Sequence, residues 1–186
     1  LMYSIDKSEL SLADEIARAW EAETRFELEV DDIRKVWIKD VNNLLMIKTD
    51  GEVKKVGGYL NYGISVKGAW AINNNMIIVK KALTEYFVNG TPVEETVNKS
   101  TDIFDFQLIA KAGKKYREAY HEVNGEKIPV QKVNRVYAAK DTRYGKLYKV
   151  KAETDAVAKI EMLPDHCIID NDNRLTVDGI DRTFYI

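Results

Sequence analysis

The spacing of apolar residues changes near Thr101, and this change limits most strongly what the chain can fold into. Before it, residues 76–88 repeat apolar side chains every three or four positions, as amphipathic helices do. After it, residues 116–123 and 127–133 alternate apolar and polar side chains, which is typical of half-buried strands. The Asn-Gly pair between these two runs is a strong hairpin signal. Separate blocks of helix and hairpin predict an α+β fold.

The same two periods predict the other elements. An amphipathic helix is expected over residues 10–23, with Ser8 able to cap its first turn. Another is expected to begin at Thr91-Pro92 and to run to about residue 99. Strands are expected at residues 26–30, 35–41, 44–48, 52–56, 104–108, 135–140, 148–152 and 157–162, and the start of a helix at residues 180–186.

The Gly- and Asn-rich residues 57–75 are expected to form a loop and a hinge between two lobes. Residues 1–66 are predicted to form a small antiparallel sheet with one helix. Residues 67–186 are predicted to form a mixed helical and β-hairpin-rich lobe with a basic, β-rich core at residues 109–151. We expect the two lobes to move relative to one another, as hinged domains do.

Charge is strongly segregated along the chain. Residues 109–151 hold twelve Lys or Arg against four acids, with five tyrosines among them, although the whole chain has a net charge of −2. Residues 1–34 hold ten acids against four bases, and residues 152–186 hold eight against three. A basic block with interleaved tyrosines is typical of a surface that binds nucleic-acid phosphates. The alternative is the solvated face of a two-sided sheet.

Several classes of function lack the residues they need. The chain has one cysteine, Cys167, and two histidines, His121 and His166, so a zinc site or a nucleophilic triad is not expected. Asp170 and Asp172 lie in a turn that lacks the pattern of a calcium loop. We therefore expect no catalytic residue, metal or cofactor in this chain. No apolar run is long enough to span a membrane, and the single cysteine fits a cytoplasmic location.

Three segments resemble the C-terminal part of a phage-type family B DNA polymerase. They are residues 41–59 (VNNLLMIKTDGEVKKVGGY), 78–97 (IVKKALTEYFVNGTPVEETV) and 131–140 (QKVNRVYAAK). The resemblance implies that residues 1–66 are the end of the catalytic palm and residues 67–186 the DNA-binding thumb. It also implies a parent enzyme that uses Mg²⁺, held by aspartates that precede this chain. Leu44 departs from the family, which usually has Tyr there.

The resemblance and the basic block together imply the residues that contact the duplex. In the first lobe they are Asn43, Lys48, Lys54 and Lys55, and in the second Lys132, Asn134, Arg135, Tyr137 and Lys140. The implied partners are primer-template DNA and the remainder of the polymerase. A polymerase must accept every template, so backbone contacts are expected rather than base readout. Without aspartate motifs, the chain is expected to incorporate no nucleotide on its own.

Two other interpretations remain open from the sequence. One is a free-standing, non-enzymatic nucleic-acid-binding module that shares only its charge pattern with the polymerases. The other is an interaction domain whose acidic N-terminal helix docks on a basic partner. Because the chain opens on Leu1 with Met2 second, we expect it to be a piece of a longer polypeptide.

Overall fold

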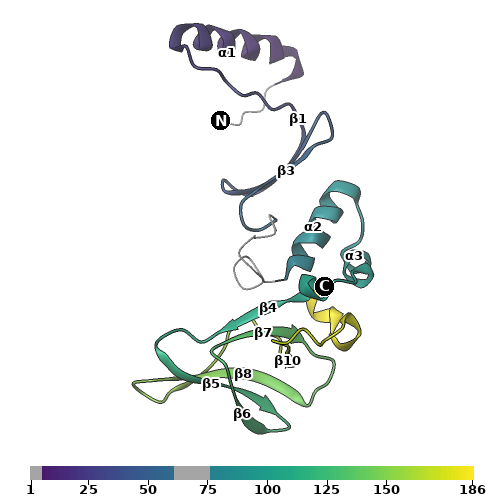
Figure 1. The fold of residues 1–186 in the computed structure, drawn as a ribbon. Coiled ribbons are helices and arrows are strands. Elements are labelled where there is room, and N and C mark those ends of the chain that lie inside the picture. Colours follow the sequence, from purple (N-terminus) through teal and green to yellow (C-terminus); the bar gives the residue numbers. More distant parts are fainter. Residues whose placement is uncertain (1–5, 61–75) are drawn as a thin grey trace.

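The computed structural model describes residues 6–60 and 76–186, and it has a mixed α+β fold. The elements follow one another along an elongated body (Figure 1), with the first helix at one end and a β-rich part at the other. Three antiparallel sheets make up the strands of the described residues. The predicted fold class is therefore confirmed. The proposed lobe boundary at residue 66 lies outside the described residues, and the two-lobe division stays a prediction.

Residues 6–60 contain one α-helix and one small sheet. A short 3₁₀ turn, η1 (Lys7–Glu9), leads into α1 (Leu10–Thr24). The sheet has the order β1-β2-β3, with β1 at Ile33–Asp40, β2 at Asn43–Lys48 and β3 at Val53–Val56. Asp50 and Gly51 form the tight turn between β2 and β3, and Gly51 adopts the positive φ that such a turn requires. The predicted hairpin is therefore confirmed.

Two helices and a short 3₁₀ turn join this sheet to the rest. They are α2 (Ile77–Asn89), α3 (Val93–Lys99) and η2 (Ile103–Phe106). Gly90 ends α2 in the left-handed conformation that glycine favours at this position. Arg182, far away in sequence, donates to the carbonyl oxygens of Val97, Asn98 and Ser100 and so caps the C-terminal end of α3.

The β-rich part has two sheets. One has the order β10-β7-β4, with β4 at Leu108–Lys111, β7 at Val133–Ala138 and β10 at Cys167–Ile169. The other has the order β6-β5-β8-β9, with β5 at Tyr116–Val123, β6 at Glu126–Val130, β8 at Tyr144–Lys151 and β9 at Val157–Lys159. The chain ends in the short turns η3 (Val177–Gly179) and η4 (Arg182–Tyr185).

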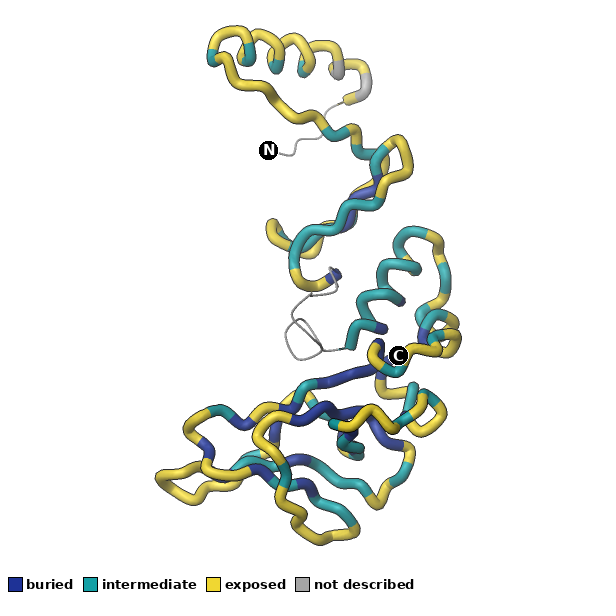
Figure 2. The backbone as a smooth tube through the Cα atoms, viewed as in Figure 1, coloured by how far each residue is buried: buried dark blue, intermediate teal, exposed yellow. Residues whose placement is uncertain are grey.

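Helix α2 belongs to two hydrophobic clusters. Ile78 and Ala82 are fully buried in the large cluster that also contains β4, β7 and β10. Leu83 and Phe87 pack against the smaller cluster around Leu45 of β2. The helix therefore joins the small sheet to the β-rich part through opposite faces. Figure 2 shows that buried backbone is concentrated in the β-rich part, whereas the N-terminal helix is mostly exposed.

Some sequence predictions are wrong, each for a local reason. Residues 26–30 form no strand: Arg25 ends α1 in a left-handed conformation, and no described strand pairs with the segment that follows. Phe104 lies in η2 rather than in a strand, because the Asp102 side chain accepts from its backbone N–H and caps the turn. Ser8 does not cap α1, whose N-cap is Glu9 without a side-chain bond.

The sequence also predicts that six aromatic residues lie in the core, and this prediction is only partly correct. They are Trp37, Trp70, Tyr86, Phe87, Phe104 and Phe106. Phe106 is fully buried, and Trp37 and Phe87 are half-buried and in ring contact. Tyr86 and Phe104 are exposed instead. Trp70, also predicted to lie in the core, is outside the described residues.

Replacing Leu45 with alanine tests the junction between the small sheet and α2. Leu45 is fully buried, so Leu45→Ala is expected to lower the free energy of unfolding by about 2–5 kcal/mol. The matched control is Ile38→Ala on the neighbouring strand, where the side chain is 59% exposed and the expected change is within about 0.5 kcal/mol. Urea denaturation of both variants provides the measurement. Equal losses would contradict the burial pattern.

Candidate nucleic-acid interface

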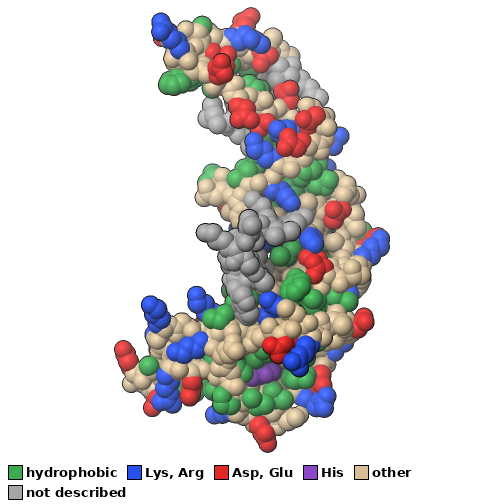
Figure 3. Space-filling view, in the orientation of Figure 1, with side chains coloured by type: hydrophobic (Ala, Val, Ile, Leu, Met, Phe, Trp, Pro, Cys, Tyr) green, Lys and Arg blue, Asp and Glu red, His purple; other side chains and the backbone are tan. Residues whose placement is uncertain are grey.

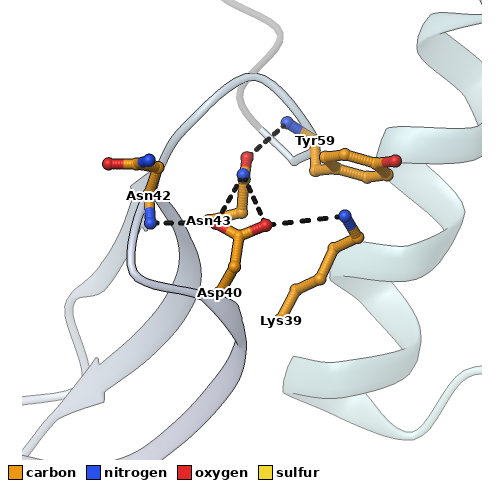
Figure 4. A network of polar contacts seen from close by, with 5 residues as sticks. All are labelled: Lys39, Asp40, Asn42, Asn43 and Tyr59. Carbon is orange, nitrogen blue, oxygen red and sulfur yellow. Dashed lines mark hydrogen bonds and ion pairs between the residues drawn. The ribbon is translucent and has the colours of Figure 1, made fainter.

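A polar network holds the turn between β1 and β2 (Figure 4). The carboxylate of Asp40 accepts from the backbone N–H of Asn42 at 2.9 Å and from the amide of Asn43 at 2.9 and 3.1 Å. These bonds hold the pKa of Asp40 below its usual range, the amide of Asn43 being the main cause. Lys39 completes the network, with its ammonium 3.7 Å from the ring centre of Tyr59 and 3.5 Å from Asp40. The turn is therefore held by several side-chain contacts.

Asn43, a predicted duplex contact, is fully engaged in this network. Its amide nitrogen donates to Asp40, and its amide oxygen accepts from the backbone N–H of Tyr59 at 3.3 Å. Gly57 packs directly against the same side chain: a Cβ at Gly57 would lie 2.0 Å from the Asn42 carbonyl oxygen and 2.3 Å from Asn43 Oδ1. The present structure gives Asn43 a positioning role in which it ties the chain after β3 to the β1–β2 turn.

The hairpin lysines are paired with Asp31. Its carboxylate lies 2.8 Å from the ammonium groups of both Lys48 and Lys54, and Lys48 also pairs with Glu52 at 2.6 Å. The hydrogen bond from Lys48 is the largest cause of the lowered pKa of Asp31, and Lys54 adds to it. Lys55 is half-buried on β3. The predicted hairpin contacts therefore carry less uncompensated positive charge than the sequence indicates.

Three of the predicted thumb contacts are buried, which corrects the sequence interpretation. Asn134, Arg135 and Tyr137 on β7 are only 1%, 3% and 1% exposed. Asn134 bonds to the Gln131 carbonyl and to the Asn171 side chain, and the Arg135 guanidinium lies 5.1 Å from the ring centre of Phe104. These side chains lie in the interior and are not presented at the surface.

Burial also governs the acidity of Tyr137. Loss of solvent raises the pKa of its hydroxyl to about 12. Arg135 and Tyr137 were predicted from the basic block and the resemblance, and neither shows that β7 is the central strand of its sheet. A central strand can have both faces covered, so alternation of residue types does not mark an outer face there.

Lys132 and Lys140, the other two predicted thumb contacts, are exposed. The Lys140 ammonium donates to the Asp178 carbonyl oxygen at 3.1 Å. Lys132 lies just before β7, where its carbonyl oxygen accepts from the backbone N–H of Ala112 at 2.8 Å. That bond joins Lys132 to the segment between β4 and β5, so it becomes part of a larger group of lysines.

This group, the Tyr116 lysine cluster, gathers at one end of the β-rich part. Lys151 pairs directly with Tyr116 in the ladder between β5 and β8, and Lys111 pairs with Val133, next to Lys132. The Ala152 N–H donates to the Lys115 carbonyl oxygen at 3.0 Å. Figure 3 shows Lys and Arg side chains over this end. The cluster comprises Lys111, Lys114, Lys115, Lys132, Lys149 and Lys151.

The ring of Tyr116 contacts two lysines of the cluster. Tyr116 is 8% exposed and packs with Ala112 and Ala119 in a small hydrophobic cluster of its own. The ammonium groups of Lys149 and Lys115 lie 4.8 and 5.5 Å from its ring centre, within the range of cation–π attraction. The ring therefore holds two lysines side by side although their charges repel.

The lysines of this cluster are not neutralised by acids. None of the six forms an ion pair within the part of the chain that the structure describes. Two nearby carboxylates, Glu118 and Asp155, are paired with Arg117 instead. Unpaired ammonium groups in one place attract phosphate and release its counterions on binding.

Sequence reasoning missed five of these six lysines as specific contacts. Their segments are 17 to 40 positions apart, and no local pattern marks them as neighbours. The positive charge of residues 109–151 predicted the region that contains the cluster. It did not predict which lysines of that region lie together. Only the pairing of β5 with β8 and of β4 with β7 brings them together.

Neither a metal group nor a membrane span is found in the described residues. No three His, Cys, Asp or Glu side chains there gather in a way that could hold a metal ion. Among the helices that the structure describes, none has the length and apolar character needed to cross a bilayer.

Substituting Gly57 tests the network at the β1–β2 turn. Gly57→Ala adds a Cβ that overlaps the Asn42 carbonyl oxygen and also strains a backbone with φ of +84°. Gly51→Ala is the matched control: its φ is +91° but nothing lies within 4 Å, so only the backbone strain of roughly 1–2 kcal/mol is expected. We expect Gly57→Ala to lower the free energy of unfolding clearly more than Gly51→Ala. Similar losses in chemical denaturation would show that the close approach does not matter.

The pairing of Asp31 with two lysines predicts a pH-dependent contribution to stability. The pKa of Asp31 is lowered by Lys48 and Lys54, so its stabilising effect is complete above its ordinary pKa of 3.8 and is lost as the pH falls through the lower, folded-state value. Asp31→Asn should therefore lower the melting temperature at pH 7 but have little effect once the wild-type carboxylate is protonated.

Asp32→Asn is the control, because Asp32 takes part in none of the ion pairs of the described chain. It removes the same charge from the neighbouring position. Melting curves between pH 7 and pH 2.5 should converge for the Asp31 variant and the wild type only at the acidic end. A difference that persists unchanged at the lowest pH would contradict the ion-pair explanation.

Comparisons with known proteins do not identify a function for this surface. No protein-family model matches the chain, and neither a curated protein nor a solved structure matches it. The function must therefore be inferred from the chemistry of these side chains and from the resemblance in the sequence.

Proposed function

We propose that this protein binds duplex DNA through its phosphate backbone, as the palm and thumb part of a family B DNA polymerase. The observation that carries the proposal is the Tyr116 lysine cluster, six lysines from separate segments without an acidic partner in the described chain. The parent enzyme would perform template-directed DNA synthesis, with Mg²⁺ held by aspartates outside this chain.

The composition of the cluster fits backbone binding rather than base readout. Its charged members are all lysines, whose flexible stems and compact charges suit phosphates in any sequence. Side chains that read base edges by paired hydrogen bonds, such as Asn134 and Arg135, are buried in the core instead. This division matches the need of a polymerase to hold every template equally well.

Exposed apolar side chains in the N-terminal part support the proposal that this chain has a partner. Leu12, Ile16 and Trp20 of α1 are exposed, as are Phe26, Leu28 and Val30 after it. Trp20 stacks on Phe26 with ring centres 6.1 Å apart, so the helix and the following segment form one apolar surface. Contiguous apolar surface of this kind marks an interaction site in soluble proteins.

We assign this apolar surface to the remainder of the polymerase palm. Alternating apolar residues at 26–30 suit a strand that pairs with a neighbour, and none of the described strands provides one. A free-standing nucleic-acid-binding module would not need such a surface. The exposed segment therefore favours the polymerase over the free-standing module.

The test is duplex binding at several salt concentrations. If four to six lysines neutralise phosphates, the slope of log K against log salt is expected to be roughly −3.5 to −5.5. Lys132→Ala should make the slope less steep by about 0.9 and weaken binding in parallel on unrelated sequences. Fluorescence anisotropy with several labelled duplexes gives both quantities.

Lys99→Ala is the matched control for Lys132→Ala. Lys99 is also an exposed lysine, but it lies on α3 and is paired with Glu95. Its replacement should leave the salt slope unchanged. Binding that is indifferent to salt, or equal losses in both variants, would remove the Tyr116 lysine cluster as the duplex surface. A loss confined to one sequence would indicate base readout and contradict the polymerase assignment.

A further inference from the structure

The outer face of the β6-β5-β8-β9 sheet carries a pair of stacked tyrosines. Tyr120 of β5 and Tyr148 of β8 are direct partners in the ladder, with ring centres 5.1 Å apart and planes inclined by 18°. Both residues are half-buried. Their neighbours along the strands, His121 and Leu147, are buried on the opposite face, so the tyrosine pair faces away from the core.

Lysines flank the tyrosine pair on both outer strands. The row across the sheet is Pro129, Tyr120, Tyr148 and Lys159, one residue from each strand. Lys127 of β6 has its ammonium 5.1 Å from the ring centre of Tyr120. Neighbouring strands lie about 4.8 Å apart, so a lysine lies close to the aromatic pair on each side. A short segment of ligand can therefore contact the rings and both lysines.

The carboxylates beside the rings do not form ion pairs with Lys127 or Lys159. Lys146, also near Tyr148, is paired with Asp165, and Glu122 interacts with the Tyr148 hydroxyl. Neither Lys127 nor Lys159 forms an ion pair with a carboxylate in the described chain. A hollow of about 270 Å³ lies between Lys146, Lys159 and Asp165, bordered by Leu163 and Pro164.

We propose that this face binds single-stranded nucleic acid, with a base stacked on Tyr148 and phosphates held by Lys159 and Lys127. Aromatic side chains on the two central strands of a four-stranded sheet, with cations at its edges, are a general way to bind unpaired bases. One face of the Tyr120 ring is turned to Tyr148 and the ring also contacts Lys127. The Tyr148 ring therefore offers the free stacking surface, on the side of Lys159.

The ligand differs from that of the Tyr116 lysine cluster. A duplex keeps its bases stacked on one another and presents no free base face to Tyr148. The cluster, by contrast, is built of charges around a buried ring and offers no exposed aromatic face. The tyrosine face is therefore a second site, which adds to the proposed function and does not depend on it.

The decisive variant is Tyr148→Leu, with Tyr148→Phe as its matched control. Binding of a fluorescein-labelled oligothymidylate is measured by anisotropy, and thermal unfolding checks that each variant is folded. Loss of the ring should weaken single-strand binding about tenfold, whereas phenylalanine keeps the stacking surface and should stay within about twofold of wild type. Lys159→Gln should make the salt slope on the single strand less steep by about 0.7.

The proposals can fail separately. Duplex binding should be unchanged in Tyr148→Leu, and saturating duplex should not displace the single strand. If a folded Tyr148→Leu binds oligothymidylate as wild type does, or if Tyr148→Phe loses binding equally, the tyrosine face is not a base-stacking site. Loss of single-strand binding in Lys132→Ala but not in Tyr148→Leu would assign both ligands to the Tyr116 lysine cluster.

Discussion

The packing of α2 on two hydrophobic clusters is the interaction on which the rest of the structure depends. Ile78 and Ala82 anchor the helix in the large cluster, and Leu83 and Phe87 anchor the small sheet against its other face. Leu45 and Ile47 of the β1-β2-β3 sheet are buried in the small cluster, against which Leu83 and Phe87 of this helix pack. The position of the β1–β2 turn relative to the β-rich part therefore follows from one helix.

Electrostatic pairing divides the lysines of this protein into two kinds. In the small sheet, Asp31 forms ion pairs with Lys48 and Lys54, and these pairs stabilise the fold. At the far end of the β-rich part, Arg117 forms the ion pairs with Glu118 and Asp155. The positive charges of the neighbouring lysines are therefore not balanced by these carboxylates. The same residue type thus stabilises the fold in one place and offers positive charge to a ligand in another.

Strand β8 connects the two proposed binding surfaces. Its alternation places Tyr148 on the outer face and Lys149 against the Tyr116 ring on the opposite side, while Lys151 ends the strand beside Tyr116. One eight-residue strand therefore contributes to an aromatic face and to a lysine cluster. A change of register by one residue would exchange the two faces.

The sequence alone determined the α+β class, α1, the hairpins at Asp50-Gly51 and Asn124-Gly125, and the basic character of residues 109–151. These features depend on local spacing, turn chemistry and composition, which need no knowledge of distant contacts. Tertiary structure decided which side chains are accessible: β7 became a central strand, so Asn134, Arg135 and Tyr137 were buried although their pattern indicated a surface. It also assembled the Tyr116 lysine cluster and the stacked tyrosines. Strand pairing joins residues far apart in sequence, and local spacing does not contain that information.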